Sequence, residues 1–163
     1  MIWSSSRLGD LVKCDRGIIQ TGPFGSQLHS SDYTDEGIPV IMPKDIASGR
    51  VDPKSVARVS EETALRLSRH RLNPRTIVFP RRGEISKRAF IGEEQSGWLC
   101  GTGCVQIMFE GRHLLPEFLY YYMERRDVVQ WLERRAVGTT MLNLNTAIVA
   151  ELPVRFPPLE VQE

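Results

Sequence analysis

The sequence has little of what membrane and secreted proteins need. Its 163 residues contain no apolar run near the ~20 residues of a membrane span, and the N-terminus lacks the basic-then-apolar order of a signal peptide. Three cysteines, Cys14, Cys100 and Cys104, are an odd number without a paired spacing. This pattern argues against a disulfide framework and favours a reducing compartment. We therefore expect a soluble, cytoplasmic protein without membrane contact.

Motifs of enzymes and metal sites are equally scarce. The stretch Gly101–Gly103 lacks the lysine and hydroxyl residue of a phosphate loop, and no G-x-S-x-G or H-E-x-x-H occurs. Cys100 and Cys104, with His113 and Cys14, could be considered as zinc ligands. Their C-x3-C spacing and the apolar surroundings of Cys104 instead favour buried small hydrophobes. The sequence thus predicts no metal, no cofactor and no catalysis by this chain.

What is present is an ordinary globular composition with an uneven distribution of charge. With 41% apolar and 25% charged residues, the chain is long enough for one domain and short for two. The net charge is +1, yet residues 65–88 hold eight of the 21 Lys and Arg and one of the 20 Asp and Glu. This segregation predicts one basic face for a polyanion.

The spacing of apolar residues and the positions of Gly, Pro and N-cap residues predict an α+β domain. A helix is expected from the N-cap Ser60 to about Arg71, a long one from Pro116 to about Arg135, and a short one over 146–151. Strands are expected over 17–20, 37–41, 76–79, 88–91, 104–109 and 152–156. Pro39 places its strand at a sheet edge or at a strand start. We expect a strongly twisted, mostly antiparallel sheet, including a meander from 76 to 109, with flanking helices.

The strongest candidate for binding is a basic loop between two expected strands. Arg81, Arg82, Lys87 and Arg88 flank Gly83, and a hairpin tip can present such a cluster to a groove or to phosphates. The same pattern also fits a solvated hairpin tip. The nearby aromatics, Phe79, Phe90 and Trp98, could stack on bases, but strand positions favour the core.

Several strings, taken in order, resemble a known family. They are Ile19–Leu28 (IQTGPFGSQL), Gly37–Ile41 (GIPVI), Val78–Lys87 (VFPRRGEISK), Gly97–Gly103 (GWLCGTG), Gly138–Thr146 (GTTMLNLNT), Leu152–Val154 (LPV) and Pro157–Gln162 (PPLEVQ). Together they resemble a target recognition domain of the specificity subunit of type I restriction-modification enzymes. The resemblance spans nearly the whole chain.

The resemblance implies a module that reads double-stranded DNA without chemistry of its own. In that family, two such domains, held apart by long helices, each read half of a split target for methyltransferase and motor-nuclease subunits. Residues 1–156 would form the recognition domain and 157–163 the start of a truncated spacer helix, which leaves the isolated chain mainly monomeric. The expected DNA contacts are Arg81, Arg82, Lys87 and Arg88, then Ser26 and Gln27, Lys44, Thr139 and Thr140.

Two alternatives from other classes remain open. The chain could be the C-terminal recognition domain of a single-chain methyltransferase or restriction enzyme. It could also be a protein-interaction module whose basic face meets an acidic partner rather than DNA. Salt-sensitive binding to a random duplex would separate the last alternative from the other two.

Overall fold

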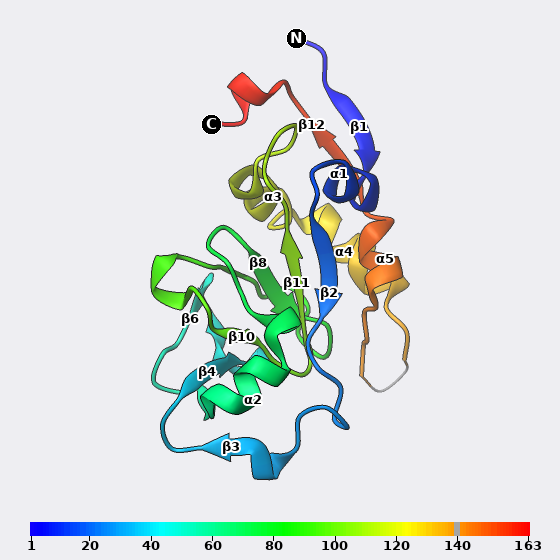
Figure 1. Ribbon diagram of the computed structural model, residues 1–163. Coiled ribbons are helices and arrows are strands. Elements are labelled where there is room, and N and C mark those ends of the chain that lie inside the picture. The colour runs from blue at the N-terminus through cyan, green and yellow to red at the C-terminus, as the bar shows by residue number, and fades with distance from the viewer. Residues whose placement is uncertain (139–140) are drawn as a thin grey trace.

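The structure, a computed structural model drawn in Figure 1, describes residues 1–138 and 141–163. Its α-helices are α1 (Leu8–Cys14), α2 (Glu61–Arg66), α3 (Pro116–Tyr122), α4 (Arg126–Arg135) and α5 (Thr146–Ala150). Its strands are β1 (Ser4–Arg7), β2 (Ile18–Thr21), β3 (Tyr33–Thr34), β4 (Ile38–Ile41), β5 (Ile46–Ala47), β6 (Arg50–Val51), β7 (Ala57–Val59), β8 (Ile77–Pro80), β9 (Ala89–Phe90), β10 (Leu99–Cys100), β11 (Cys104–Met108) and β12 (Pro153–Phe156). In the described part of the chain, none of the helices has the length and apolar character that a bilayer crossing requires.

The strands confirm the predicted α+β, mostly antiparallel architecture. One sheet has the order β2-β11-β8-β9 and is antiparallel throughout, while the second, β10-β4-β7-β3, contains one parallel pair, β10 with β4. Two ribbons, β1-β12 and β5-β6, complete the set. The expected meander from 76 to 109 is wrong in one respect. β11 pairs with β8 and not with β9, so β8 lies between β9 and β11. β10, which precedes β11 in the chain, pairs with β4 in the second sheet.

Strands β8 and β11 are buried on both faces, which explains their apolar residues, whereas β2 is half-buried. On β8, Ile77 and Phe79 pack into the core formed with α1, α3, α4 and α5, whereas Val78 packs on the opposite side toward the second sheet. The period of two in a strand produces this division. Phe79 is fully buried, and Phe90 and Trp98 pack against these cores, as the sequence predicts.

The long helix predicted over 116–135 is broken into two. Helix α3 ends at Tyr122 and α4 begins at Arg126, with Arg125 in an extended conformation. The buried positions Met123 and Val128 are five residues apart, which in one unbroken helix would place them on different faces. The break restores both to the core. Arg125 also binds the Asp127 carboxylate through Nε and Nη2 at 3.0 and 2.8 Å in the first turn of α4.

Two local signals in the sequence are confirmed. Ser60 accepts a hydrogen bond from the Thr63 amide at 3.1 Å and caps α2, although α2 ends at Arg66 and a 3-10 turn follows. β4 is an inner strand, yet β10 pairs only with its last two residues, Val40 and Ile41. Pro39 therefore lies at the strand start beyond the reach of β10, where its missing N–H costs no ladder bond.

Candidate nucleic-acid interface

Several loops meet at one end of the β2-β11-β8 sheet. Because β2 and β8 are both antiparallel to β11, the ends of β2 and β8 lie beside the start of β11. The segments that follow or precede these strand ends are 22–28, 81–87 and 101–103. Residues 141–145 join them, since the Leu144 amide donates to the Arg81 carbonyl at 2.7 Å and Arg82 bridges to Asn143. We call these four segments the loop edge.

The loop edge lies away from both chain ends. Strands β1 and β12 pair over their full lengths, from Ser4 with Phe156 to Arg7 with Pro153, and so bring the two termini together. Figure 1 shows this ribbon and both termini beyond the start of β2, whereas the loops lie beyond its end. The paired termini and the loop edge therefore lie at opposite ends of the β2-β11-β8 strands.

Segment 22–28 is held tightly against segment 101–103. A Cβ on Gly22 would lie 1.9 Å from the Gly101 carbonyl oxygen, so no other residue fits there without a shift. Thr102 donates from Oγ1 to the Pro23 carbonyl at 2.7 Å. Gln27, half-buried, accepts from the Phe24 amide at 3.0 Å through Oε1. Ser26 is exposed next to it.

Arg81 is not the exposed contact that the sequence predicted. Its side chain is 6% exposed, and Nη1 donates to Asn143 Oδ1 at 2.9 Å. The guanidinium lies 5.7 Å from the centre of the Phe24 ring, and its buried Nε has no protein partner among the described residues. Burial, followed by the neighbouring Arg82 charge, lowers the pKa of Arg81. Arg81 thus joins three segments of the loop edge from beneath.

Arg88 is also a structural residue, contrary to expectation. The side chain turns toward α3, where Nη2 lies 2.5 Å from Glu124 Oε1 and Nε donates to the Tyr120 carbonyl at 3.0 Å. Its guanidinium lies 5.0 Å from the centre of the Tyr120 ring. With its side chain 11% exposed, Arg88 cannot reach a ligand at the loop edge without breaking these contacts.

Arg82, Lys87 and Lys44 remain on the surface. Arg82 is exposed, and among the described residues no carboxylate lies within ion-pair distance. Lys87 is half-buried and pairs with Glu84 at 3.0 Å. Lys44 is 61% exposed and donates to Asp45 Oδ1 at 2.8 Å and to the Ser55 carbonyl. The expected contacts Thr139 and Thr140 lie outside the described residues.

Lys44 borders the loop edge through its neighbour Pro43. A Cβ on Gly103 would lie 3.2 Å from Pro43 Cγ, so the turn that carries Lys44 contacts segment 101–103. Asp45 is fully buried beneath it and accepts from the Met42 amide at 2.9 Å. The Lys44 ammonium is thus partly neutralised by this carboxylate.

The basic stretch 65–88 does not form one face. Arg75 precedes β8 and Arg81 follows it, which separates them by about 20 Å along an extended chain. Most of the cations in this stretch form ion pairs with carboxylates. The pairs are Arg66 with Asp32, Arg71 with Glu61, Arg75 with Glu117, Lys87 with Glu84, and Arg88 with Glu124. Among the described residues, Arg69, Arg81 and Arg82 have no such pair, and Arg81 is buried. The predicted face is therefore reduced to a few cations at the loop edge.

The sequence reasoning missed Phe24 and Asn143. Phe24 is 56% exposed at the loop edge, and Asn143 is the partner of Arg81. A signal for Phe24 was present, because Pro23 and Gly25 isolate one large apolar residue within a loop. Asn143 lies 62 residues from its partner, and no local pattern marks it.

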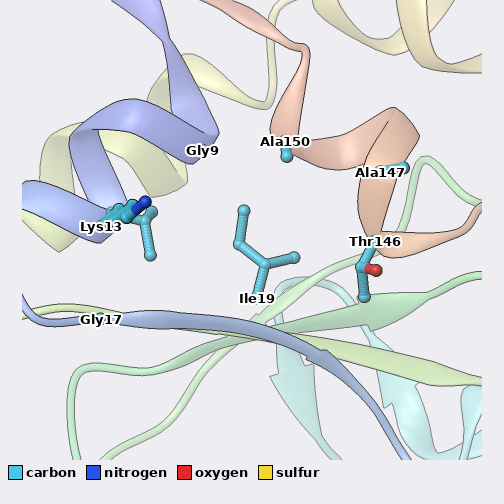
Figure 2. A pocket seen from close by; sticks show the side chains of 8 residues that line it. Gly9, Lys13, Gly17, Ile19, Thr146, Ala147 and Ala150 are labelled. Atoms are coloured by element: carbon cyan, nitrogen blue, oxygen red, sulfur yellow. The ribbon is translucent and has the colours of Figure 1, made fainter.

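A hollow of about 330 Å³ lies between α1, α5 and β2 (Figure 2). Gly9 lets the two helices approach closely, since a Cβ there would lie 2.7 Å from Ala150 Cβ. Ile19 points into the hollow from β2, and Thr146 and Lys13 lie at its sides. Lys13 is the one ionisable side chain among its lining residues, so the hollow holds no acid–base pair.

Cys14 lies apart from the other two cysteines. Cys100 and Cys104 are buried near each other, where burial raises the pKa of Cys100 to about 12. Cys14 is exposed at the end of α1. His113 follows the end of β11, the strand that Cys104 begins, and its Nδ1 lies 3.6 Å from Asp15 Oδ1. The four residues considered as zinc ligands are therefore not brought together.

The fold is shared with specificity subunits of type I restriction-modification systems. The S subunit from M. genitalium matches 95% of this chain with a TM-score of 0.61 and 17% identity, and the HsdS subunit from Thermoanaerobacter tengcongensis matches 98% with 0.67 and 19%. A further structure, from a study of complex assembly and conformational transition of the type I R-M system, matches 98% with 0.69 and 18%.

The sequence places the chain in the corresponding family. The family model described as the type I restriction modification DNA specificity domain matches residues 2–163, and the chain belongs to this family. The Escherichia coli type I restriction enzyme EcoBI specificity subunit is 23% identical over 164 residues, which cover 98% of this chain and 32% of that protein. The chain spans 34 to 39% of the three structural relatives. The resemblance seen in the sequence is confirmed, and neither alternative finds support here.

Proposed function

We propose that this domain reads one half of a split double-stranded DNA target and contributes specificity, not catalysis, to a type I restriction-modification complex. The observation that carries the proposal is the loop edge, where segments from four parts of the chain form one surface opposite the paired termini. Loops on a rigid sheet are the usual location of binding residues. Membership in the DNA specificity domain family supports DNA as the ligand.

The surface side chains of the loop edge have the chemistry of DNA recognition. Arg82 carries a guanidinium with no carboxylate partner among the described residues, which suits a guanine edge or a phosphate. Gln27 retains its amide N–H groups and a carbonyl lone pair for an adenine edge, and Ser26 offers a hydroxyl for a phosphate. Lys44 and Lys87, each paired with a carboxylate, contribute weaker phosphate contacts. Arg81 and Arg88 support the surface and do not contact DNA.

We further propose that residues 157–163 lead from the domain into a spacer helix that sets the distance to a second recognition domain. Residues Leu159–Val161 form a 3-10 turn, and Gln162 is buried. Its amide accepts from the Leu115 amide at 2.7 Å and donates to the His113 and Pro157 carbonyls at 2.9 Å each. This anchor would fix the direction of a following helix. Methyltransferase and restriction subunits would assemble on the helices, leaving the isolated 163-residue chain monomeric.

The test is selection from a pool of randomised duplexes, using the 163-residue chain at low salt. Enrichment of one short motif is expected, on a background of non-specific binding with a Kd of about 10⁻⁴ to 10⁻⁶ M at physiological salt. Arg82→Ala should weaken or relax the motif, whereas Arg69→Ala, an unpaired arginine outside the loop edge, should leave it unchanged. Binding without any sequence enrichment would contradict the proposed reading role.

A further inference from the structure

One large apolar side chain of the loop edge stands out from its surroundings. Phe24 is 56% exposed, although the residue before it, Pro23, is buried. The residue after it is Gly25, where an added Cβ would meet nothing within 4 Å. No neighbouring side chain along the chain therefore covers the ring, and its outer part is open to an approaching surface.

The backbone that carries Phe24 is fixed rather than loose. The Phe24 amide donates to Gln27 Oε1 at 3.0 Å, and the Phe24 carbonyl accepts from the Gln27 and Leu28 amides at 2.8 and 3.2 Å. On the other side, Thr102 holds the Pro23 carbonyl at 2.7 Å. The backbone that carries the ring is thus held in place, and a ligand that binds the ring need not order the loop first.

The charges around the ring match a polyanion. The Arg81 guanidinium lies 5.7 Å from the ring centre on the protein side and is anchored by Asn143. Arg82, the next residue, is exposed and has no carboxylate partner among the described residues. An exposed apolar ring beside one buried and one exposed guanidinium suits a ligand that has phosphates on its outer surface and flat aromatic bases in its interior. Duplex DNA has that construction.

Resting on the function proposed above, we propose that Phe24 inserts between neighbouring base pairs of the bound duplex as an apolar wedge. Phenylalanine is among the side chains that proteins use to unstack a base step and bend the duplex. The energy of this deformation depends on the step, and flexible pyrimidine–purine steps deform most easily. Phe24 would thereby add selectivity for deformable DNA to the base contacts of Arg82 and Gln27.

The experiment compares two duplexes of about 30 base pairs with one mixed sequence, one fully paired and one with a central T·T mismatch. A 2-aminopurine beside the central step reports unstacking by fluorescence, and anisotropy of the 163-residue chain at low salt gives both affinities. Wild-type protein should prefer the mismatched duplex and raise the 2-aminopurine signal. Stacking of one base on an aromatic ring corresponds to about 5- to 150-fold in affinity. Phe24→Ala should lose a factor in that range on the mismatched duplex, together with the preference.

The control is Leu65→Ala, which removes a 64% exposed apolar side chain on α2, outside the loop edge. It should retain the preference and unfold at the wild-type temperature, whereas Phe24→Ala, which loses the ring contact with Arg81, should lower Tm by about 1 to 4 °C and stay folded in the binding assay. Equal wild-type affinity for the two duplexes, or a preference that survives in Phe24→Ala, would overturn the wedge. Salt-sensitive binding that depends on Arg82 would then still support the proposed function, whereas absence of any DNA binding would overturn that function itself.

Discussion

Replacing Arg81 with alanine should destabilise the domain, although this arginine lies in a loop. The substitution removes a buried, charge-assisted hydrogen bond to Asn143, which contributes about 1.5 to 3 kcal/mol. It also removes the contact with the Phe24 ring, which contributes about 0.5 to 1 kcal/mol. Loss of the buried, unpartnered Nε offsets part of this sum. We expect a net loss of about 1 to 3 kcal/mol in the free energy of unfolding.

Thermal unfolding followed by circular dichroism measures this effect. For a domain of this size, 1 kcal/mol shifts Tm by about 2 to 4 °C, so Arg81→Ala should lower Tm by about 2 to 12 °C. Arg82→Ala is the matched control, because the same change at an exposed neighbour should stay within about 0.5 kcal/mol. A double-mutant cycle with Asn143→Ala should show coupling between the two side chains. Unchanged Tm for Arg81→Ala would refute its assignment as an anchor.

Three further outcomes follow from glycine packing, histidine burial and thiol burial. Gly22→Ala should cost about 2 kcal/mol or more because the new Cβ would lie 1.9 Å from a carbonyl oxygen, whereas Gly25→Ala, with nothing within 4 Å, should be neutral in the same melting assay. Burial lowers the pKa of His70, so the unfolded chain binds its proton more tightly than the folded one. Urea titrations should show stability falling as pH drops below about 6.5, and His70→Gln should reduce that fall; a pH-independent wild type would contradict this. Under a thiol reagent at pH 8, Cys14 should react at once and Cys100, whose pKa is raised to about 12, only on unfolding; a folded Cys14→Ser variant that still reacts rapidly would contradict the burial.

The sequence predicted correctly those features that interactions between residues close in the chain determine. Ser60 caps α2 because its hydroxyl needs only an amide three residues away. Pro39 is near a strand start, paired with β7 but beyond the reach of β10, because a residue without an N–H is disfavoured between two hydrogen-bonded strands. The sequence contains a signal for the break between α3 and α4, because the buried Met123 and Val128 lie five positions apart and would not share a helix face. Averaging the apolar periodicity over the whole segment conceals this single irregular spacing.

Whether each arginine is buried or exposed depends on tertiary structure. Arg81 and Arg82 are adjacent and identical, and β8, which precedes them, is buried on both faces. The alternation of the strand therefore does not tell the anchor from the surface residue, and the partner that holds Arg81, Asn143, lies 62 residues away. Arg88 likewise pairs with Glu124, 36 positions away, and charge counting along the chain cannot reveal such a partner. The same reason explains why a segregated basic stretch did not become a basic face.

The most direct test of the central claim is an NMR titration of the ¹⁵N-labelled chain with a duplex, followed by the backbone amide shifts. If the loop edge is the DNA surface, the large shifts should fall in residues 22–28, 82–87 and 101–103 and diminish as salt is raised. The β1–β12 ribbon at the paired termini should remain unchanged. Shifts concentrated on that ribbon, or no shifts at low salt, would contradict the account.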